Sequence, residues 1–594
     1  MTSRFSWRSA GMAAAAATLV LCFASAPPAL AQPAAGGQHA SGGQHASGGQ
    51  HASGGQHASG GQHASGGQHA SAGQPASAGQ PASGGRPASA ARAADGASGG
   101  GGATAAAGAG ALREATGDPR HPRRPRLPRV CLALGATLST TTGEFDAADE
   151  ASPPDTARIQ AALDRCAGTG QAVELRAGPA DAGPADAGAA SAFLSGPLTI
   201  GRHEVLLIDD GVTLYASLNP ADYQIPAQYP ANTCGTVSAD GGGCEPFITF
   251  AGSGSGLDGT RGPDGSLGAV DGRGEDILVG GTQSWWDVAQ AAASGGNQNN
   301  PILVEGDGVN DITIYQVELE NSPMYHVYIQ NGFGLTVWGV EINSPATARN
   351  TDGVDPVSES DVTIKDDMIQ NGDDCVAVKS NPGTPSRNVT VDDVNCYGSH
   401  GLSVGSQTAG GVSNVLFENS TLSGFDSFGN LSVSDTGIQI KTDANSGGLT
   451  RRVTYTGICM TNIKHVLIFN PHYSSGGTEV PTQSDIVLNG VVSTDSESGA
   501  YSIFEGFDAT NPLQIALENV DLDNVTQDGN HGNEGPTEGE SPTEYVNAYT
   551  YNTNMVPEGP EGDTTNGVTV TPVQGTGTVP ACDIPAFGPP PAGR

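Results

Sequence analysis

Several carboxyl, imidazole and ammonium side chains recur in this sequence at intervals that place them in one register of a repeating structure. They are Asp352, the pair Asp373 and Asp374, then His400, and finally Lys441 next to Gln439. The step from Asp352 to Asp373 and the step from Asp373 to His400 are each close to the length of one repeat unit. Carboxyl groups held close together repel one another, so that one can keep its proton while another stays ionised. Such a set can protonate a leaving group and activate water, which is the chemistry of glycoside hydrolysis.

Each of these residues also has a purely structural interpretation. Gly353 and Gly372 stand beside Asp352 and Asp373, and an aspartate next to a glycine commonly bends the backbone in a turn. A single histidine is likewise most often a structural group. The shared register favours catalysis, because turns alone do not require carboxyl, imidazole and ammonium groups at corresponding points of consecutive units.

The elements that would position these residues are short β-strands. Triplets rich in β-branched residues recur along the chain, beginning at Ile312, Leu335, Val362, Val389, Val415, Val453, Ile486 and Ile515. The starts of consecutive triplets are roughly 23 to 38 residues apart, and one strand signature in each unit of this size is typical of a stacked repeat.

Each unit carries a second apolar run about half a unit after the first, for example at residues 375–378 and 402–404. Two strands and two turns in about 25 residues predict one coil of a parallel β-helix, because a propeller blade needs about 40 residues. We therefore predict an all-β fold, a right-handed parallel β-helix over residues 130–594. Neighbouring strands lie about 4.8 Å apart, so a polar residue repeated in register forms a ladder on one wall.

A short helix is expected to cap the N-terminal end of this β-helix. Asp155 and Thr156 are followed by Ile159, Ala162 and Leu163 at helical spacing. An aspartate at this point can accept hydrogen bonds from the first turn, which predicts a capped amphipathic helix.

Four blocks of the sequence resemble the signature blocks of glycoside hydrolase family 28, the polygalacturonases and their relatives. They are residues 350–356 (Asn-Thr-Asp-Gly-Val-Asp-Pro), 372–375 (Gly-Asp-Asp-Cys), 398–401 (Gly-Ser-His-Gly) and 440–442 (Ile-Lys-Thr). Residues 322–327 fit a fifth block, and the resemblance covers about residues 131–585. It implies an inverting hydrolase that uses no metal or other cofactor and cleaves α-1,4-galacturonosidic linkages in pectin.

The resemblance also implies roles for individual residues. Asp373 would be the general acid that protonates the glycosidic oxygen, and Asp352 and Asp374 would hold and deprotonate the attacking water. His400 would tune the protonation of the acid, whereas Asp355 is interpreted as a structural acid in a turn. The residues expected to bind substrate are Asn350, Gln439, Lys441 and Tyr473. Among them, Lys441 would bind the sugar carboxylate and Tyr473 would line a sugar subsite.

The resemblance has one departure, at Gln439, where polygalacturonases carry arginine. A guanidinium binds a carboxylate through two hydrogen bonds, whereas glutamine offers a neutral amide. The substrate could therefore be a methyl-esterified or substituted pectin or rhamnogalacturonan, or a neighbouring coil could supply the cation from Arg349, Arg387 or Lys464. Two other functions are compatible with the fold: a calcium-dependent pectate lyase, and a non-catalytic adhesin or carbohydrate-binding protein.

Residues 1–129 are expected to lie outside the β-helix. Residues 1–31 are interpreted as a signal peptide, with a basic start, an apolar run and a small-x-small cleavage site. Residues 32–129 predict a disordered linker, because Gln-His-Ala-Ser-Gly-Gly repeats and a Gly/Ala/Ser tract bury almost nothing apolar. The repeat histidines are more simply explained by a flexible linker than by a metal site, and residues 120–129 are interpreted as a spacer or processing site.

Charge and cysteine content narrow the class of protein. The net charge of −37 argues against nucleic acid or an anionic membrane surface as the main partner. Eight cysteines remain after signal removal and none forms a Cys-x-x-Cys pair, which favours disulfides in an exported protein. Local pairing predicts Cys234–Cys244 and Cys375–Cys396, and elimination then leaves Cys131–Cys166 and Cys459–Cys582. We expect a secreted monomer that binds pectic polysaccharide and has no membrane partner once the signal peptide is removed.

Overall fold

The computed structural model describes residues 112–178, 190–225, 232–239, 241–474, 477–527, 543–559 and 566–591. The predicted signal peptide, the His-containing repeats and the rest of the expected linker up to residue 111 lie outside the described residues. Within the described ranges, the structure contains no helix with the length and apolar character that crossing a bilayer requires.

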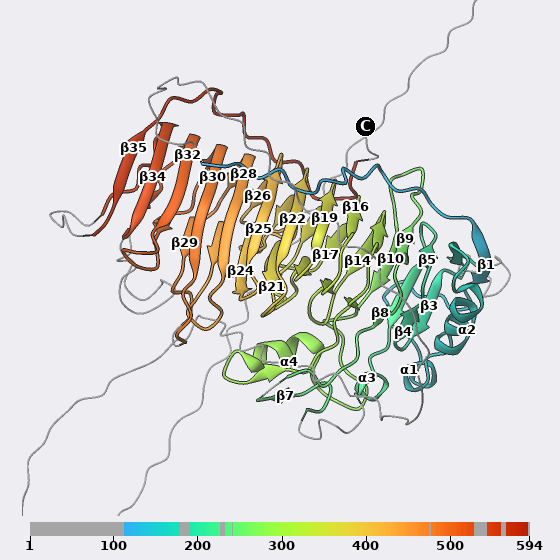
Figure 1. Cartoon of the computed structure of the whole chain (residues 1–594). Coiled ribbons are helices and arrows are strands. Elements are labelled where there is room, and N and C mark those ends of the chain that lie inside the picture. Colours follow the sequence, from blue (N-terminus) through green and yellow to red (C-terminus); the bar gives the residue numbers. More distant parts are fainter. Residues whose placement is uncertain are drawn as a thin grey trace, which may run out of the picture. The chain divides into compact units, whose positions relative to one another are not determined.

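Two parallel sheets run along a stack of coils (Figure 1). Sheet B consists of eleven described strands: β4 (Leu198–Ile200), β8 (Ile248–Phe250), β12 (Val304–Asp307), β15 (Val327–Gln330), β18 (Val354–Val357), β21 (Val376–Ser380), β24 (Leu402–Thr408), β27 (Thr436–Lys441), β29 (His465–Asn470), β31 (Tyr501–Phe504) and β33 (Thr526–Gln527). The prediction of a right-handed parallel β-helix is confirmed, and this hand is the one that nearly all parallel crossover connections adopt.

Sheet A is larger and contains 22 described strands. They are β1 (Val130–Gly135), β2 (Gln171–Arg176), β3 (Ala192–Ser195), β5 (Glu204–Ile208), β6 (Thr213–Ala216), β9 (Gly256–Gly259), β10 (Gly268–Asp271), β13 (Thr313–Tyr315), β14 (Val317–Glu320), β16 (Thr336–Trp338), β17 (Glu341–Asn343), β19 (Ser360–Lys365), β20 (Met368–Gln370), β22 (Ser386–Asp392), β23 (Asn395–Tyr397), β25 (Val412–Glu418), β26 (Thr421–Ser423), β28 (Leu449–Thr461), β30 (Thr482–Thr494), β32 (Leu513–Leu522), β34 (Val546–Thr553) and β35 (Thr569–Pro572). All the predicted triplets lie at strands of this sheet, which confirms the repeat.

Most coils contain three strands rather than the predicted two. In one coil β19, β20 and β21 follow one another, and they pair with β22, β23 and β24 of the next coil. Asp366 adopts a left-handed conformation (φ 58°) and makes the bend between β19 and β20. Because β20 has only 3 residues, its apolar pattern cannot be separated from that of β19 in the sequence. From β28 onward the two strands are continuous, as the 13 residues of β28 show.

The hydrophobic core lies inside the coils, where the inner faces of the sheets meet. Side chains alternate between the two faces of a strand. On β21, Val376 and Val378 belong to the main core, whereas Ala377 and Lys379 point to the outer face of sheet B. The outer face of sheet B is therefore where each coil can present a polar side chain.

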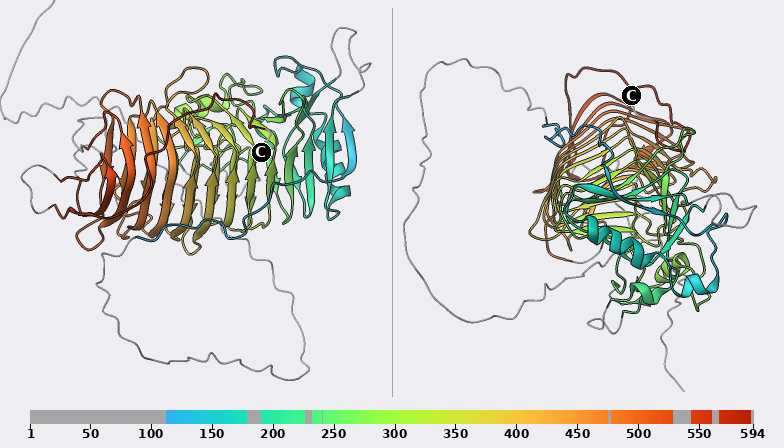
Figure 2. Two further views of the ribbon diagram at one scale, coloured as in Figure 1. Left: turned by 90° about the horizontal axis from the view of Figure 1, so that it is seen from above. Right: turned by 90° about the vertical axis from the view of Figure 1, so that its right-hand side faces the viewer.

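The predicted capping helix is confirmed as α2 (Thr156–Cys166), which covers the N-terminal end of the coils (Figures 1 and 2). Ile159 and Leu163 are fully buried against the first strands. The capping role of Asp155 is wrong, because its carboxylate makes no hydrogen bond to the first turn. Asp155 instead accepts the backbone N–H of Leu194 at 2.8 Å and binds Arg158 at 2.5 Å, which ties the helix to β3.

The folded region begins before residue 130, so the expected linker boundary has to be corrected. Residues 112–129 lie along the strands of sheet A as the blue trace in Figure 1, and Ala115 and Asp118 within them are buried. We call residues 112–124 the N-terminal strap. The spacer interpretation of residues 120–129 failed because the strap docks through hydrogen bonds and carries no hydrophobic period.

The strap crosses one coil after another along a row of threonines. The backbone N–H groups of Ala115 and Asp118 donate to the hydroxyls of Thr454 and Thr390, both at 2.8 Å. The hydroxyl of Thr363 donates to Asp118 Oδ2, also at 2.8 Å. These threonines are the central residues of the repeating triplets, so the repeat itself provides the docking row.

All four predicted disulfides are present in the structure. They are Cys131–Cys166, Cys234–Cys244, Cys375–Cys396 and Cys459–Cys582. The third joins Cys375, which ends the turn that contains Asp373 and Asp374, to β23 of the next coil.

The remaining described elements are short. They are the helices α1 (Ala147–Ala151), α3 (Pro220–Tyr223) and α4 (Trp285–Ala292) and the antiparallel pair β7 (Val237–Ser238) and β11 (Asn297–Gln298). In Figure 1, α4 and β7 lie beside the ends of the sheet B strands. The acidic region from 526 to 565, read from the sequence as a loop or a disordered stretch, contains β34 in its described part.

Candidate active site

The predicted acids and the histidine lie in turns that lead into sheet B on three successive coils. Asp352, Asp374 and His400 each come shortly before a strand and at the same distance from it, at β18, β21 and β24. The first residues of these strands pair with one another, so the three positions share one register. Asp373 lies one position earlier in its turn, so the structure aligns His400 with Asp374 rather than with Asp373.

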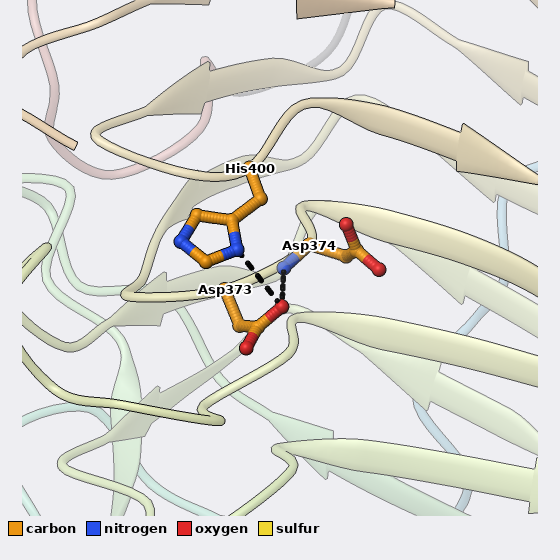
Figure 3. Close-up of side chains that lie close together, drawn as sticks. All are labelled: Asp373, Asp374 and His400. Atoms are coloured by element: carbon orange, nitrogen blue, oxygen red, sulfur yellow. Dashed lines mark hydrogen bonds and ion pairs between the residues drawn. The ribbon is translucent and has the colours of Figure 1, made fainter. Parts of the chain in front are cut away.

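Asp373 is held by uncharged donors and by the imidazole (Figure 3). Its Oδ2 accepts the side-chain amide of Asn350 at 2.9 Å, and its Oδ1 accepts the backbone N–H of Asp374 at 2.9 Å. His400 Nδ1 lies 3.1 Å from Asp373 Oδ1, and the backbone N–H of His400 donates to the Asp373 carbonyl at 2.7 Å. Asn350 reaches this position from a left-handed backbone conformation (φ 60°), which asparagine tolerates better than most residues.

Asp374 points away from the carboxyl group of Asp373 and is held by a cation (Figure 3). Lys441 Nζ donates to both of its carboxylate oxygens, at 3.0 and 2.8 Å. Ser403 Oγ and Gln439 Nε2 donate to its Oδ1 at 2.8 and 3.1 Å. These hydrogen bonds, two of them from an ammonium group, are charge-assisted and fix the orientation of this carboxyl group.

Asp352 has a partner that the sequence analysis missed. Lys379 Nζ lies 2.9 Å from Asp352 Oδ2 and 2.5 Å from Asp355 Oδ2. Asp355, interpreted as an acid in a turn, is in fact a fully buried residue of β18. The alternation of apolar residues in 375–380 would have placed Lys379 on the outer face, and its separation from Asp352 along the sequence is one coil.

The pKa values of this buried ion-pair cluster are strongly coupled. Burial and the charge of Asp373 raise the pKa of Asp352 well above its usual value, and Lys379 opposes this shift. Burial raises the pKa of Asp355 to about 6, again against the effect of Lys379. Burial lowers the pKa of Lys379, but Asp352 and Asp355 outweigh burial and raise it well above its usual value. Lys379 therefore stays charged throughout the neutral range.

The predicted substrate-binding residues lie on the same face, in β27 and just after β29. Lys441 is one of the outward residues of β27, and its Nζ lies 5.6 Å from the ring centre of Tyr473. Burial lowers the pKa of Lys441, but the charge of Asp374 outweighs it and raises the pKa above its ordinary value. Gln439 also points outward from β27, and its Nε2 donates to Asp374, to Ser403 Oγ at 2.8 Å and to the His400 carbonyl at 2.8 Å. Its amide nitrogen thus joins the turn that carries Asp374 to the turn that carries His400.

His326, from the fifth block, organises the turn that carries Asp352. Its Nδ1 lies 3.1 Å from the carbonyl oxygens of both Thr351 and Asp352, and its Nε2 lies 2.9 Å from Ser344 Oγ. Because two carbonyls can only accept, Nδ1 carries the proton and Nε2 accepts from the serine hydroxyl. Burial lowers the pKa of His326 to about 4, so the ring is neutral at the pH values that matter for Asp352.

Besides Oδ1 of Asp355 in the ion-pair cluster, two polar atoms of the site have no hydrogen-bond partner within the described residues: Oδ1 of Asp352 and Nε2 of His400. Both are buried, and an uncompensated buried polar atom is unfavourable. Both therefore have hydrogen-bonding capacity left for a substrate hydroxyl, a glycosidic oxygen or a water molecule.

A metal ion could in principle use Asp373, Asp374 and His400, whose ligand atoms lie within 4.8 Å of one another. The ammonium group of Lys441 already binds both oxygens of Asp374. A cation would have to displace Lys441 or accept its repulsion, so the donor set fits an ion-paired hydrolytic site better than a divalent cation.

Comparisons with known proteins identify the family of this chain. Residues 263–534 match the family described as glycosyl hydrolases family 28. A polygalacturonase of Ralstonia nicotianae is 34% identical over 451 residues, which cover 68% of this chain and 80% of the relative. An endo-polygalacturonase of Pectobacterium carotovorum subsp. carotovorum is 35% identical over 370 residues, covering 62% of this chain and 84% of the relative.

The solved structure of a polygalacturonase from Erwinia carotovora ssp. carotovora has a similar fold. Its TM-score is 0.59 at 32% sequence identity, with 73% of this chain and 99% of that chain covered. The residues that match the family include the coils that carry the aspartates and the lysines. The chain therefore belongs to family 28 of the glycosyl hydrolases and is a glycosidase.

Proposed function

We propose that this protein is a secreted hydrolase that cleaves α-1,4-galacturonosidic linkages in pectin by an inverting mechanism that needs no metal. The observation that carries the proposal is the pairing of carboxylates and lysines: Lys379 with Asp352, and Lys441 with Asp374. Relatives named polygalacturonase and endo-polygalacturonase support a galacturonan as substrate. The family membership supports hydrolysis of a glycosidic bond.

Asp373 is the general acid in this proposal. Asp352 and Asp373 repel each other, so the pair retains a proton at pH values at which a free aspartate has lost it. Lys379 favours the charge on Asp352, which leaves the proton on Asp373, whose partners are amide groups and the His400 ring. Asp373 then protonates the glycosidic oxygen as the bond to the leaving sugar breaks.

Asp352 and Asp374 act together on the attacking water. Each is paired with a lysine, and both lie close to the acid, one on the preceding coil and one next to it in the same turn. One accepts the proton of the water as the water attacks the anomeric carbon, and the other orients it. His400 tunes the protonation of Asp373 through the contact at Nδ1. An inverting reaction places acid and base on opposite sides of the sugar, and the product has the opposite anomeric configuration.

Substrate binding involves the four other predicted residues. Lys441 binds a sugar carboxylate, and Tyr473, whose ring lies beside the lysine ammonium, stacks on a sugar face. Asn350 orients the general acid through its hydrogen bond to Asp373. Gln439 orients Asp374 and leaves its amide oxygen for a sugar hydroxyl.

Export of the protein from the cell is supported by its N-terminal sequence and its disulfides. The signal-like residues 1–31 and the four disulfides are typical of a protein that folds in an oxidising compartment. The partner is then a pectic polysaccharide outside the cell, and the protein works as a monomer without nucleic acid or membrane.

The direct experiment is to incubate the protein with polygalacturonate and with pectin in excess chelator and to measure reducing ends. The proposal expects release of reducing ends in chelator, and NMR of the first product shows an inverted anomer. Unsaturated, ultraviolet-absorbing products that require calcium would instead identify a lyase. Absence of products from every pectic polymer would refute the enzyme proposal.

A variant of the general acid separates catalysis from binding. Asp373→Asn keeps the hydrogen bond of the backbone N–H and should lower kcat by about 100-fold to 10,000-fold, with pectin binding retained. Asp258→Asn changes a buried carboxyl group of β9 in the same way and should keep the activity of the parent. If Asp373→Asn turned over substrate at the parent rate, a binding protein or another acid would have to be considered.

A further inference from the structure

The outward positions of sheet B form a row that runs through the active site. Ala377, Ser403, Gln439, Ile468 and Ile503 are equivalent in register on five successive coils. None of the five carries a charge. Two of them, Ser403 and Gln439, donate directly to Asp374, so the row passes next to the reacting groups.

Gln439 lies in this row between Ser403 and Ile468. Its Nε2 already has three acceptors: Asp374, Ser403 Oγ and the His400 carbonyl. What remains toward substrate is the amide oxygen, which accepts hydrogen bonds and repels a carboxylate.

Beyond Gln439 the row becomes apolar. Ile468, one coil on, forms a cluster with Tyr501 and Ile503 that is separate from the main core, as expected for side chains on the outer face of sheet B. Ile468 is 8% exposed, which is comparable with 7% for Asp373 and for Lys441. Because Ile468 pairs in register with Gln439, a sugar unit that extends from Asp374 along the row next meets Ile468. Apolar surface favours a methyl group over an ionised carboxylate, which loses its hydration there.

Within the described residues, both lysines of this face already bind aspartates. Lys441 shares its charge between Asp374 and the sugar carboxylate proposed above, so neither lysine is left for a second carboxylate at Gln439 and Ile468. Lys379 is bound to Asp352 and Asp355, and Lys441 is bound to Asp374. Together with Asp373, the cluster contains four carboxyl groups and two ammonium groups. Acidic groups therefore outnumber basic ones around the site, which opposes a substrate carboxylate and tolerates its ester.

The other basic residues considered from the sequence do not turn toward this row. Arg349 donates from Nη1 to the carbonyl of Ala289 in α4 at 3.0 Å. Arg387 is an exposed residue of β22, a strand of sheet A. Lys464 acts on Asp435, whose pKa its charge lowers against the effect of burial.

We propose that the outer face of β27 and β29, at Gln439 and Ile468, is a subsite for a galacturonosyl residue whose carboxyl group is methyl-esterified. Methyl-esterified homogalacturonan is then the preferred substrate class. This inference rests on the proposed pectin hydrolysis and specifies which form of pectin is bound.

The first test compares one homogalacturonan in two forms, highly methyl-esterified and fully de-esterified, at matched chain length. The expected ratio of kcat/KM, esterified over de-esterified, is at least about 10. A ratio below one would overturn the proposal. Loss of methyl esters during the assay would leave de-esterified polymer in the esterified sample, so methanol release is measured in parallel.

Variants that introduce a positive charge show which residues cause the preference for the methyl ester. Ile468→Lys should lower the ratio about 10-fold, because the new ammonium group attracts a carboxylate and disfavours the ester methyl. Gln439→Arg should shift the ratio in the same direction, although it also alters the contact with Asp374. Val237→Lys adds the same charge at an exposed position of β7 and should leave the ratio unchanged. An unchanged ratio in both site variants would overturn the assignment of the subsite.

A binding measurement distinguishes failure of this inference from failure of the proposed function. Asp373→Asn protein is titrated calorimetrically with a short methyl-esterified oligogalacturonide and with its de-esterified counterpart. Tighter binding of the ester, together with no hydrolysis of either polymer by the parent protein, would reject the proposed hydrolysis and retain the subsite. Tighter binding of the de-esterified oligomer would reject the subsite whatever the activity.

Discussion

The ammonium nitrogen of Lys379 lies 2.9 Å from Oδ2 of Asp352, a residue of the preceding coil. The same nitrogen lies 2.5 Å from Oδ2 of Asp355. One lysine thus joins a turn carboxylate that faces the reaction to a strand carboxylate that is fully buried. Its charge lowers the pKa of Asp352 against the effect of burial, so in the proposed mechanism Lys379 acts through Asp352.

Replacing Lys379 should move the pH profile of the enzyme. Lys379→Met removes the cation that lowers the pKa of Asp352, so this pKa rises further and the ionised base forms only at higher pH. The acidic limb of the kcat/KM profile should shift upward by about 1 to 3 pH units. The measurement is kcat/KM on pectin across the acidic and neutral range.

Two further variants show whether this effect is electrostatic. Lys379→Arg keeps the charge and should restore most of the parent profile. Lys365→Met removes a lysine that pairs with Asp392 in sheet A and should leave the profile in place. A Lys379→Met enzyme with an unshifted acidic limb would contradict the role assigned to the lysine.

His326 should matter for the rate but not for the pH profile. His326→Ala removes the hydrogen bonds that hold the carbonyls of Thr351 and Asp352, so the base turn loses its fixed position. We expect kcat/KM to fall about 10-fold to 100-fold with an unchanged profile, because the ring is neutral above its pKa of about 4. His326→Asn can still donate at the position of Nδ1 and should recover part of the rate. A profile that shifted with His326→Ala would mean that the ring titrates during catalysis.

The N-terminal strap should stabilise the coils that it crosses. A Cβ atom at Gly117 would lie 2.0 Å from Thr390 Oγ1, and the glycine has a φ of 64°. Gly117→Ala should therefore lower the unfolding midpoint by about 3 to 8 °C, through both the backbone conformation and displacement of the strap. Gly211→Ala is the matched control, since Gly211 has a φ of 69° and open space around its Cβ position. Equal losses in the two variants would show that the strap contact contributes nothing.

The protein should be more stable in mild acid than in alkali. Burial raises the pKa of Glu320 to about 9 and that of Glu341 to about 8, on neighbouring strands of sheet A. A glutamate in the unfolded chain titrates near pH ~4.3. Above that pH the folded state holds protons that the unfolded state has lost, so the stability is full below it and falls as the pH rises through these raised pKa values.

The measurement is thermal unfolding at about pH 5 and at about pH 8.5, with a midpoint expected to be at least about 3 °C higher in the acidic buffer. Glu341→Gln removes one of the titrating groups and should reduce the difference. Glu114→Gln, at an exposed position of the strap, should preserve it. A higher midpoint in the alkaline buffer than in the acidic one would contradict this account.

The sequence by itself determined the repeat, the fold class and the identity of the central acids. Strand alternation and a spacing close to one coil are local properties, because each triplet buries its own side chains whichever coil stacks on it. The same counting placed Asp352, Asp373 and His400 at corresponding points, and the structure shifts this register by one residue, to Asp374. The helix over 156–166 was likewise predictable from the local spacing of apolar residues. The hydrogen bond from Leu194 to Asp155 was not, because it joins two distant segments.

Only the tertiary structure decided which charges meet. Lys379 binds Asp352 because strands one coil apart stack. The sequence carries the outward position of Lys379 and its spacing of one coil, but not which carboxylates its side chain reaches. Gln439 turned out to support Asp374 because long side chains bend toward the nearest unsatisfied carboxylate. The strap joins residues separated by up to 372 positions, as in the bond from Arg113 to Asp485. Such a contact depends on the finished surface of sheet A, which no local sequence pattern encodes.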